Sequence, residues 1–265
     1  MDGNQLFYEI RDLLVMLDAS EYPELFGYIE SLFDENEEYI SESPYVIATR
    51  TLECDGLKPF PRYVIDFVTR MYLSEIENGN PDAMNDLGAM HYDGHRGFEQ
   101  DYTKSVYYYK MAAEHGSRQA QENLGYCYYY GRDIPVDYEK AFHYFALGAF
   151  DGHLISLYKI GDMYSAGHYV EKNEKEAFAI YMRCLDTMTD EAAPKVAGPV
   201  YLRLGKMFLN GYGTEKNAMT ALVCFQKAET FLYDMVKNGD HMYRKSLQAA
   251  VDGQVKAREE LSKQI

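Results

Sequence analysis

The sequence contains no tryptophan, and it has only four cysteines among its 265 residues. These are Cys54, Cys127, Cys184 and Cys224, and no two of them form a C-x-x-C pair. Scattered cysteines of this kind usually pack as small apolar residues in proteins that are kept reduced. We therefore predict reduced thiols in the core of a protein from a reducing compartment.

The chain also lacks long apolar runs. Met1 is followed by Asp2, Gly3, Asn4 and Gln5, so no basic segment precedes an apolar one as it does in a secretory signal peptide. No apolar stretch is long enough to span a bilayer. The sequence thus predicts a cytoplasmic location and no membrane partner.

Positive charge is scarce. Lys and Arg total 26 against 42 Asp and Glu, which gives a formal net charge of −16. Such a chain is repelled by nucleic-acid phosphates and by anionic membranes, so we predict no nucleic-acid partner. A partner with basic residues is favoured, although acidity that serves only solubility is an equally good reading.

A Leu-Gly marker recurs along the chain. Its copies are Leu87-Gly88, Leu124-Gly125, Ile160-Gly161 and Leu204-Gly205. The glycines are 37, 36 and 44 residues apart, a period typical of helical repeat arrays. We attribute the small residue to two helices that cross closely there.

Each copy continues in the same way. A second glycine follows the marker and predicts the end of a first helix, at Gly94, Gly131, Gly167 and Gly211. A second helix is then expected to begin near Lys104, Lys140, Glu176 and Thr220, with aromatic residues at helical spacing.

The pattern A-x-x-x-L-G-x-x-Y-x-x-G, followed by K-A-x-x-[WYF]-[YF]-x-x-A-A-x-x-G, resembles the Sel-one-like repeat family, a branch of the tetratricopeptide-type repeats. Copies lie near 83–119, 120–152, 156–190 and 200–236. The resemblance implies an all-α fold, a right-handed α/α superhelix (a solenoid of helix-turn-helix repeats) with helical caps at both ends. It also implies protein binding rather than catalysis. Some secreted members of the family link the two helices of each repeat with a cysteine pair, an arrangement that this chain does not support.

Three segments are expected: an acidic helical segment at 1–62, the repeats at 63–239, and a capping helix at 240–265. In the first segment, apolar spacing predicts a helix at 4–17. A second helix is expected to follow Ser20, which serves as its cap, and a third to run from Ser43 to Leu52. A helix over 63–77 looks like part of a degenerate leading repeat. An insertion at 186–199 lengthens the spacing before the fourth copy.

Chemical motifs are missing as well. There is no G-x-S-x-G, Walker-type loop or H-E-x-x-H. His91 and His95 have metal-ligand spacing, but Gly94 lies between them and His91 occupies an aromatic position of the repeat, so a packed histidine is favoured. We predict no catalytic residue, no metal site and no cofactor, and thus not an enzyme.

The resemblance places the binding surface. In tetratricopeptide-type arrays, the first helix of each repeat lines the concave groove. Aligned on the Leu-Gly marker, the groove positions fall two residues before the Leu and two and five residues after it. The predicted groove residues are Asn85, Tyr92, Glu122, Tyr126, Tyr129, Tyr158, Asp162, Ser165 and Lys206. Tyrosine is abundant, at 26 residues, and suits a peptide-binding surface, although most tyrosines are expected to be repeat core.

Three functions remain open at this stage. The first is a scaffold or adaptor that binds a peptide or protein in the groove. The second is an acidic, immunity-type protein that neutralises one basic partner through Asp34, Glu35, Glu37 and Glu38, the densest acidic segment. The third is an enzyme or small-molecule binder, which rests on fold analogy alone. The oligomeric state stays open.

Overall fold

The computed structural model describes residues 2–33, 42–56, 58–190 and 193–263. At residues 193 and 194 it describes the backbone and not the side chains. These ranges contain thirteen α-helices and two short 3-10 helices, and they contain no β-strand. The predicted all-α class is therefore confirmed. The chain divides into two compact units, residues 1–135 and 136–265, which we describe separately.

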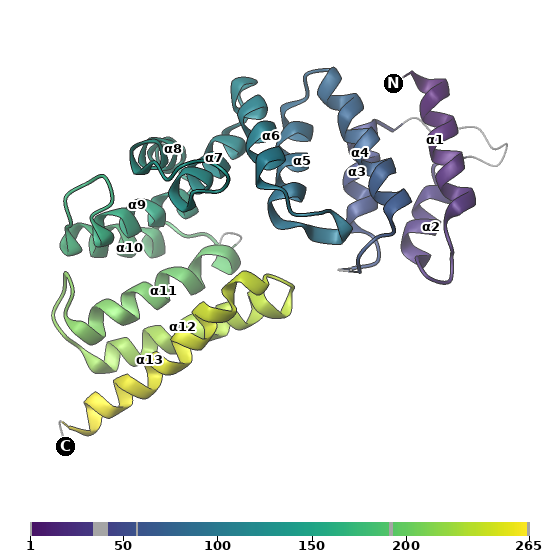
Figure 1. Cartoon of the computed structure of the whole chain (residues 1–265). Coiled ribbons are helices and arrows are strands. Elements are labelled where there is room, and N and C mark those ends of the chain that lie inside the picture. Colours follow the sequence, from purple (N-terminus) through teal and green to yellow (C-terminus); the bar gives the residue numbers. More distant parts are fainter. Residues whose placement is uncertain (1, 34–41, 57, 191–192, 264–265) are drawn as a thin grey trace. The chain divides into compact units, whose positions relative to one another are not determined.

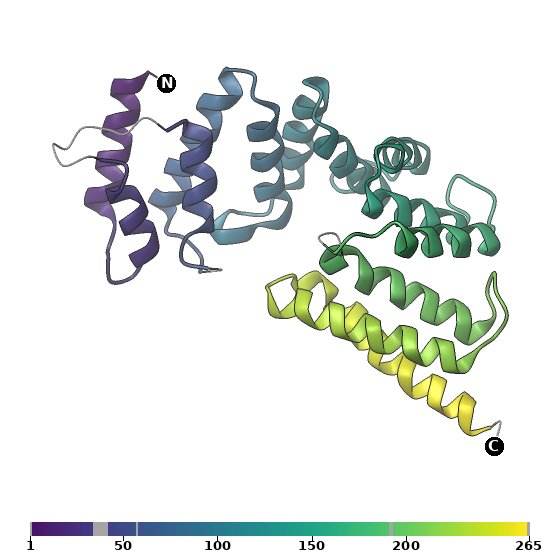
Figure 2. The same ribbon diagram turned by 180° about the vertical axis from the view of Figure 1, so that it is seen from behind.

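Both units consist of antiparallel helix pairs, seen from opposite sides in Figures 1 and 2. The amino-terminal unit contains α1 (Gly3–Met16), α2 (Pro23–Glu30), α3 (Pro44–Glu53), α4 (Arg62–Glu77), α5 (Pro81–Asp93), η1 (His95–Gly97), α6 (Tyr102–Glu114) and α7 (Arg118–Tyr130). The carboxy-terminal unit contains α8 (Tyr138–Phe150), α9 (Leu154–Ala166), α10 (Glu174–Asp186), α11 (Ala193–Asn210), α12 (Ala218–Lys237), η2 (His241–Tyr243) and α13 (Arg244–Ser262).

The predicted glycines end the first helices. Gly94, Gly131 and Gly167 have φ of 67°, 67° and 75°, in the left-handed region that a residue with a Cβ rarely adopts. Each donates its N–H to the carbonyl four residues earlier, at Met90, Cys127 and Met163. Gly211 ends α11 in the same way, with its N–H on Met207.

One kind of cap starts the second helices. The side chains of Asp101, Asp137, Asn173 and Asn217 each accept from the backbone N–H three residues later. The four distances lie between 2.9 and 3.1 Å. This bond satisfies one of the unpaired N–H groups of the first helical turn.

The marker glycines receive an aromatic ring from the second helix of their own pair. A Cβ at Gly88 would lie 2.8 Å from the ring of Tyr109, and one at Gly205 would lie 2.7 Å from the ring of Phe225. Gly161 meets Tyr181 in the same way, at 2.7 Å. The close helix crossing that the Leu-Gly pattern predicts is thus formed by an aromatic ring of the second helix that packs directly against the glycine backbone of the first.

The amino-terminal helices share their core with the helices that follow them. Ile10, Leu25 and Ile47, from α1, α2 and α3, are fully buried in the cluster that contains Val64 and Leu87 of α4 and α5. The loop after α5 fastens this segment, because the Arg96 guanidinium donates to the carbonyl oxygens of Cys54 and Gly56. It also lies 3.9 Å from the centroid of the Phe60 ring.

The predicted Ser20 cap is wrong. Helix α2 begins at Pro23, and Ser20 donates its hydroxyl to Asp18 instead. The free N–H groups of Glu24 and Leu25 bond to the carboxylate of Asp55, at 3.3 and 3.1 Å. A side chain about thirty positions away thus caps α2, which local sequence patterns do not reveal. In contrast, Ser43 caps α3 as predicted, with its hydroxyl accepting from Val46.

The second half of the predicted insertion before the fourth repeat is helical. Helix α11 begins at Ala193 and continues through Pro199, so the added residues lengthen the first helix of the pair rather than forming a loop. Gly198 lets α12 approach, because a Cβ there would lie 2.9 Å from Leu232. With 18 and 20 residues, α11 and α12 form a longer hairpin than α9 and α10, which have 13 residues each (Figure 1).

Helix α13 packs on α12 through the contact that the repeats use internally. A Cβ at Gly253 would lie 2.6 Å from the ring of Phe225. This ring therefore lies between Gly205 of α11 and Gly253 of α13. Gly253, which by helix propensity alone only weakens the last helix, permits its close approach.

All four cysteines are free, with three buried and Cys54 half-buried. Among the described helices, none has an apolar stretch long enough to cross a lipid bilayer.

Candidate functional site

In the amino-terminal unit, polar side chains connect the first helices to one another. The Asn123 amide of α7 donates to Oδ1 of Asn85 on α5 at 3.0 Å. The Asn85 amide donates to Oδ1 of the neighbouring Asp86 at 3.1 Å, and the Tyr45 hydroxyl of α3 donates to its Oδ2 at 2.9 Å. Burial raises the pKa of Asp86, and these two hydrogen bonds partly oppose the rise. Three helices thus present one fixed polar row.

Tyr92 belongs to an aromatic cluster at the end of α5. Its ring centroid lies 5.3 Å from that of Tyr102, and the Arg132 guanidinium lies 5.9 Å from Tyr92 and 4.8 Å from Tyr102. Burial raises the pKa of Tyr92, while the hydrogen bond and charge of Arg132 lower it. The half-buried Tyr92 therefore supports the loop as well as contributing to the surface.

Helix α7 carries a group of three tyrosines. Tyr126 stacks on Tyr130 with centroids 6.3 Å apart, and Tyr129 meets Tyr130 edge to face at 4.9 Å. Tyr126 and Tyr129 are half-buried, and Tyr130 is 47% exposed. Such rings offer both apolar area and hydroxyl groups to a partner. Glu122, predicted for the same surface, is buried at 5% exposure.

A charged cluster joins the first helices of the carboxy-terminal unit. Nη2 of Arg203 on α11 donates to Oδ2 of Asp162 on α9 at 2.6 Å, and Nε of Arg203 donates to Oδ1. The Tyr181 hydroxyl donates to Oδ1 at 2.7 Å, and the Lys159 ammonium lies 3.6 Å from Oδ2. Burial raises the pKa of Asp162, but Arg203 and Lys159 outweigh it and hold the pKa below its usual value.

Two other predicted residues of this unit are held by their neighbours. Tyr158 is buried, with the Arg203 guanidinium 4.9 Å from its ring centroid. The Ser165 hydroxyl donates to Glu174 at 3.1 Å, which fixes it to the start of α10. Both side chains shape the surface more than they project from it.

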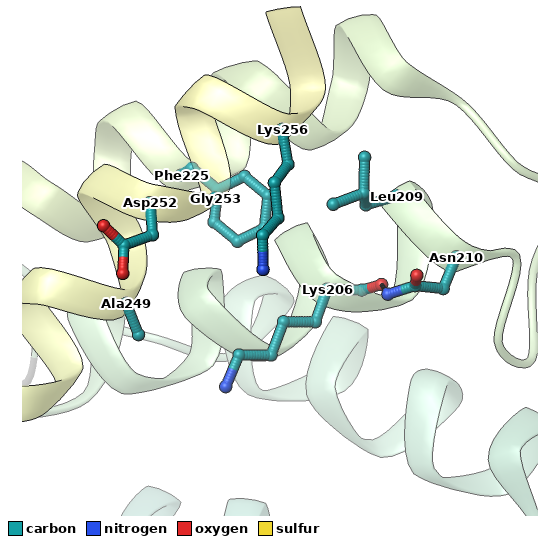
Figure 3. A pocket seen from close by; sticks show the side chains of 8 residues that line it. All are labelled: Lys206, Leu209, Asn210, Phe225, Ala249, Asp252, Gly253 and Lys256. Carbon is teal, nitrogen blue, oxygen red and sulfur yellow. Dashed lines mark hydrogen bonds between the residues drawn. The ribbon is translucent and has the colours of Figure 1, made fainter. Parts of the chain in front are cut away.

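Lys206 lies in a pocket of about 320 Å³ between α11 and α13 (Figure 3). The pocket is lined by Lys206, Leu209, Asn210, Phe225, Ala249, Asp252, Gly253 and Lys256. Lys206 is thus a predicted groove residue that lines a pocket.

The acidic end is only partly visible. Asp34, Glu35, Glu37 and Glu38 lie outside the described residues. A second pocket, of about 280 Å³, lies between α1 and α4 and is lined by Glu9, Asp12 and Asp66 among others. Glu9 pairs with Arg70 at 2.8 Å and Asp66 with Arg62 at 2.9 Å, so part of its negative charge is compensated.

His91 packs as predicted. Its ring is stacked on Tyr108 with centroids 6.2 Å apart and meets Phe98 edge to face at 5.9 Å. Burial lowers the pKa of His91, which favours the neutral ring. In the part of the chain that the structure describes, no three His, Cys, Asp or Glu side chains are placed to hold a metal ion.

The structure thus brings together Asn85 with its α7 neighbour, Tyr126 and Tyr129 through Tyr130, and Tyr158 and Asp162 through Arg203. The predicted register missed the residues that connect one first helix to another: Asp86, Asn123 and Arg203. These three share one position, immediately before the Leu of the marker, and Lys159 occupies it in the third copy. A polar or charged residue at that position in every copy is the signal that could have identified them.

Comparison with known proteins gives a consistent result. No curated protein matches the chain. The model of the Sel1 repeat matches residues 81–117, 118–153, 154–181 and 199–229.

Two solved structures are similar in fold. One is a protective antigen of uropathogenic Escherichia coli strains that displays an SLR fold, with a TM-score of 0.55 and 22% identity over 82% of this chain and 45% of that one. The other is a Sel1 repeat protein from Oxalobacter formigenes, with a TM-score of 0.54 and 21% identity over 70% of this chain and 76% of that one. The chain thus spans less than half the length of the first relative.

Proposed function

Because the chain belongs to the Sel1 repeat family, we propose that it is a non-catalytic scaffold that binds a peptide or protein segment along its first helices. The observation that carries this proposal is the set of polar contacts between successive first helices. Side chains held by hydrogen bonds lose little conformational entropy when a partner binds, so they form a prepared surface.

The tyrosines of α7 supply the second property of such a surface. Tyr126, Tyr129 and Tyr130 combine stacked rings with hydroxyl groups, and aromatic anchors of this type dominate the binding energy of many protein interfaces. We assign them as anchor residues. The fixed row from Tyr45 to Asn123 then supplies hydrogen bonds that orient the partner's backbone or polar side chains.

The test is quantitative capture of partners from the lysate of the native host, with the double variant Tyr126→Ala/Tyr129→Ala beside the wild type. We expect the variant to lose the specific partner at both low and high salt, because the anchors are aromatic. The matched control is Tyr107→Ala, which removes a tyrosine that is 58% exposed on the second helix α6. This control should retain the partner.

A circular dichroism melt of each variant excludes unfolding as the cause of a loss. If the double variant keeps its partner, and the partner dissociates only in high salt, recognition belongs to the acidic end and the scaffold proposal fails. If the wild type captures no protein, the result favours the alternative that the chain binds a small molecule.

A further inference from the structure

The pocket between α11 and α13 has no role in the fold described above. Lys206 of α11 and Lys256 of α13 line this pocket from two helices, and the Phe225 ring lies behind Lys256 (Figure 3). Leu209, Ala249 and this ring make its apolar part. The opening therefore combines an apolar base with two ammonium groups, which suits a ligand that has both methylene groups and negative charge.

Neither lysine has a counter-ion in the described part of the chain. Elsewhere in the same unit, Lys216 and Lys263 both pair with Glu260, at 2.7 and 2.6 Å. Asp252 also lines the pocket, and its Oδ1 accepts from the neutral Gln248 amide at 2.9 Å, which leaves its negative charge in place. The pocket therefore has two positive charges against one negative charge, in a chain whose net charge is −16.

The electrostatics of the pocket favour an anion. The pKa of Lys206 is lowered by burial and by repulsion from Arg203 and Lys256. Asp162 opposes this shift, but its carboxylate is already engaged by Arg203 and Lys159. An anionic group placed near the two ammonium groups would offset the repulsion between them and raise the pKa of Lys206.

We propose that this pocket binds the carboxylate of an acidic side chain in a polypeptide that lies along α9, α11 and α13. The occupant is an Asp or Glu rather than a basic residue, because the pocket has two ammonium groups against one carboxylate and its apolar base accommodates the methylene groups of Glu. This inference rests on the scaffold function proposed above. The net charge of the chain favours a partner with basic residues, and the pocket adds the requirement that this partner also has an acidic residue.

The test uses the full chain and a dye-labelled pentaglutamate peptide, followed by fluorescence anisotropy at low salt. We expect saturable binding to the wild type and about a tenfold weaker Kd for Lys206→Gln/Lys256→Gln, because each removes a charge-assisted contact. The matched control is Lys245→Gln, an exposed lysine of the same helix α13 outside the pocket. Its Kd should stay within about twofold of the wild type, since rim charges contribute little.

Four results would overturn the inference. These are equal affinity of the double variant, equal affinity for labelled pentaglutamine, absence of binding to the wild type, and displacement of the peptide by succinate or inorganic phosphate at comparable concentration. The last result would assign the pocket to a small free anion. If Lys206→Gln/Lys256→Gln still captures the host partner while pentaglutamate binding fails, the scaffold proposal stands and only the pocket inference falls.

Discussion

Arg203 of α11 holds Asp162 of α9 with two N–H groups of its guanidinium, so one ion pair joins two consecutive first helices. The Asp162 side chain is 14% exposed and that of Arg203 is 26% exposed. The Lys159 ammonium lies 3.6 Å from the same carboxylate, and the Tyr181 hydroxyl donates to it at 2.7 Å. Asp162 is thus the centre of this cluster, and removing its charge should cost more than removing one of the hydrogen bonds that it accepts.

The first prediction concerns the order of these losses. Asp162→Asn should lower the free energy of unfolding by about 3 kcal/mol or more, because it removes the carboxylate that holds the Arg203 guanidinium in a low-dielectric site. Tyr181→Phe should cost about 1 kcal/mol, because it removes one hydrogen bond to Asp162 and leaves the ion pair with Arg203 in place. Urea unfolding followed by circular dichroism measures both losses. An equal or larger loss for Tyr181→Phe would contradict this account.

The second prediction concerns acid. The folded-state pKa of Asp162 lies below its usual value, so the unfolded chain takes up this proton more readily than the folded one. The stabilisation is therefore complete above about pH 4 and is lost as the pH falls through the folded pKa. Urea unfolding between about pH 6 and pH 3 should show a gap between wild type and Asp162→Asn that narrows on the acid side. A constant gap would refute the assignment.

The third prediction tests the packing of an aromatic ring against a glycine of the marker. Gly205→Ala should destabilise the protein by about 1–3 kcal/mol, because the added methyl group would overlap the buried Phe225 ring. Gly27→Ala is the matched control, since it lies in a helix with open space around it. There the same change should stabilise by about 0.5–1 kcal/mol. Thermal unfolding of the two variants should move in opposite directions.

The fourth prediction tests the distant cap of α2. Asp55→Ala should cost about 1–2 kcal/mol, because the N–H groups of Glu24 and Leu25 lose their acceptor. Ser20→Ala should change stability by less than about 0.5 kcal/mol, since Ser20 makes only exposed local bonds. Amide hydrogen exchange at Leu25 should accelerate in Asp55→Ala alone. Faster exchange in Ser20→Ala would restore the local cap that the sequence suggested.

The fifth prediction concerns the thiols. Burial raises the pKa of Cys54 and Cys224 to about 11 and that of Cys127 and Cys184 to about 12. Because the thiolate is the reactive form, none should react quickly with Ellman's reagent at about pH 8 in the folded protein. All four should react after unfolding in urea. A fast reaction of one equivalent in the native state would show that a thiol is more accessible than its burial implies.

The helices and their ends were largely predictable from the sequence. The glycine after each first helix and the Asp or Asn before each second helix act within a few residues, so the local pattern contains the whole interaction. The range 186–199 was different. Pro199 and Gly198 indicate a break by propensity, yet both lie inside α11 because Leu232 of α12 packs against that segment.

The contacts of the candidate site were less predictable. Asn85 and Asp162 were placed by the repeat register, but their partners Asn123 and Arg203 lie 38 and 41 residues away. Which residues meet across two helices depends on the rotation of each helix about its axis, and the period of the repeat does not determine that rotation. The same reason explains why Lys256 was not associated with Lys206.

Phe225 between Gly205 and Gly253 makes the junction with the last helix equivalent to a junction inside a repeat. One ring and two glycines therefore act as a standard joint, which does not depend on the residues farther along either helix. A protein engineer could exploit this by inserting one more copy of the α11–α12 pair between α12 and α13, with its own glycine on the Phe225 ring and its own ring on Gly253. The array would then grow by whole hairpins, and its reach could be matched to a longer partner.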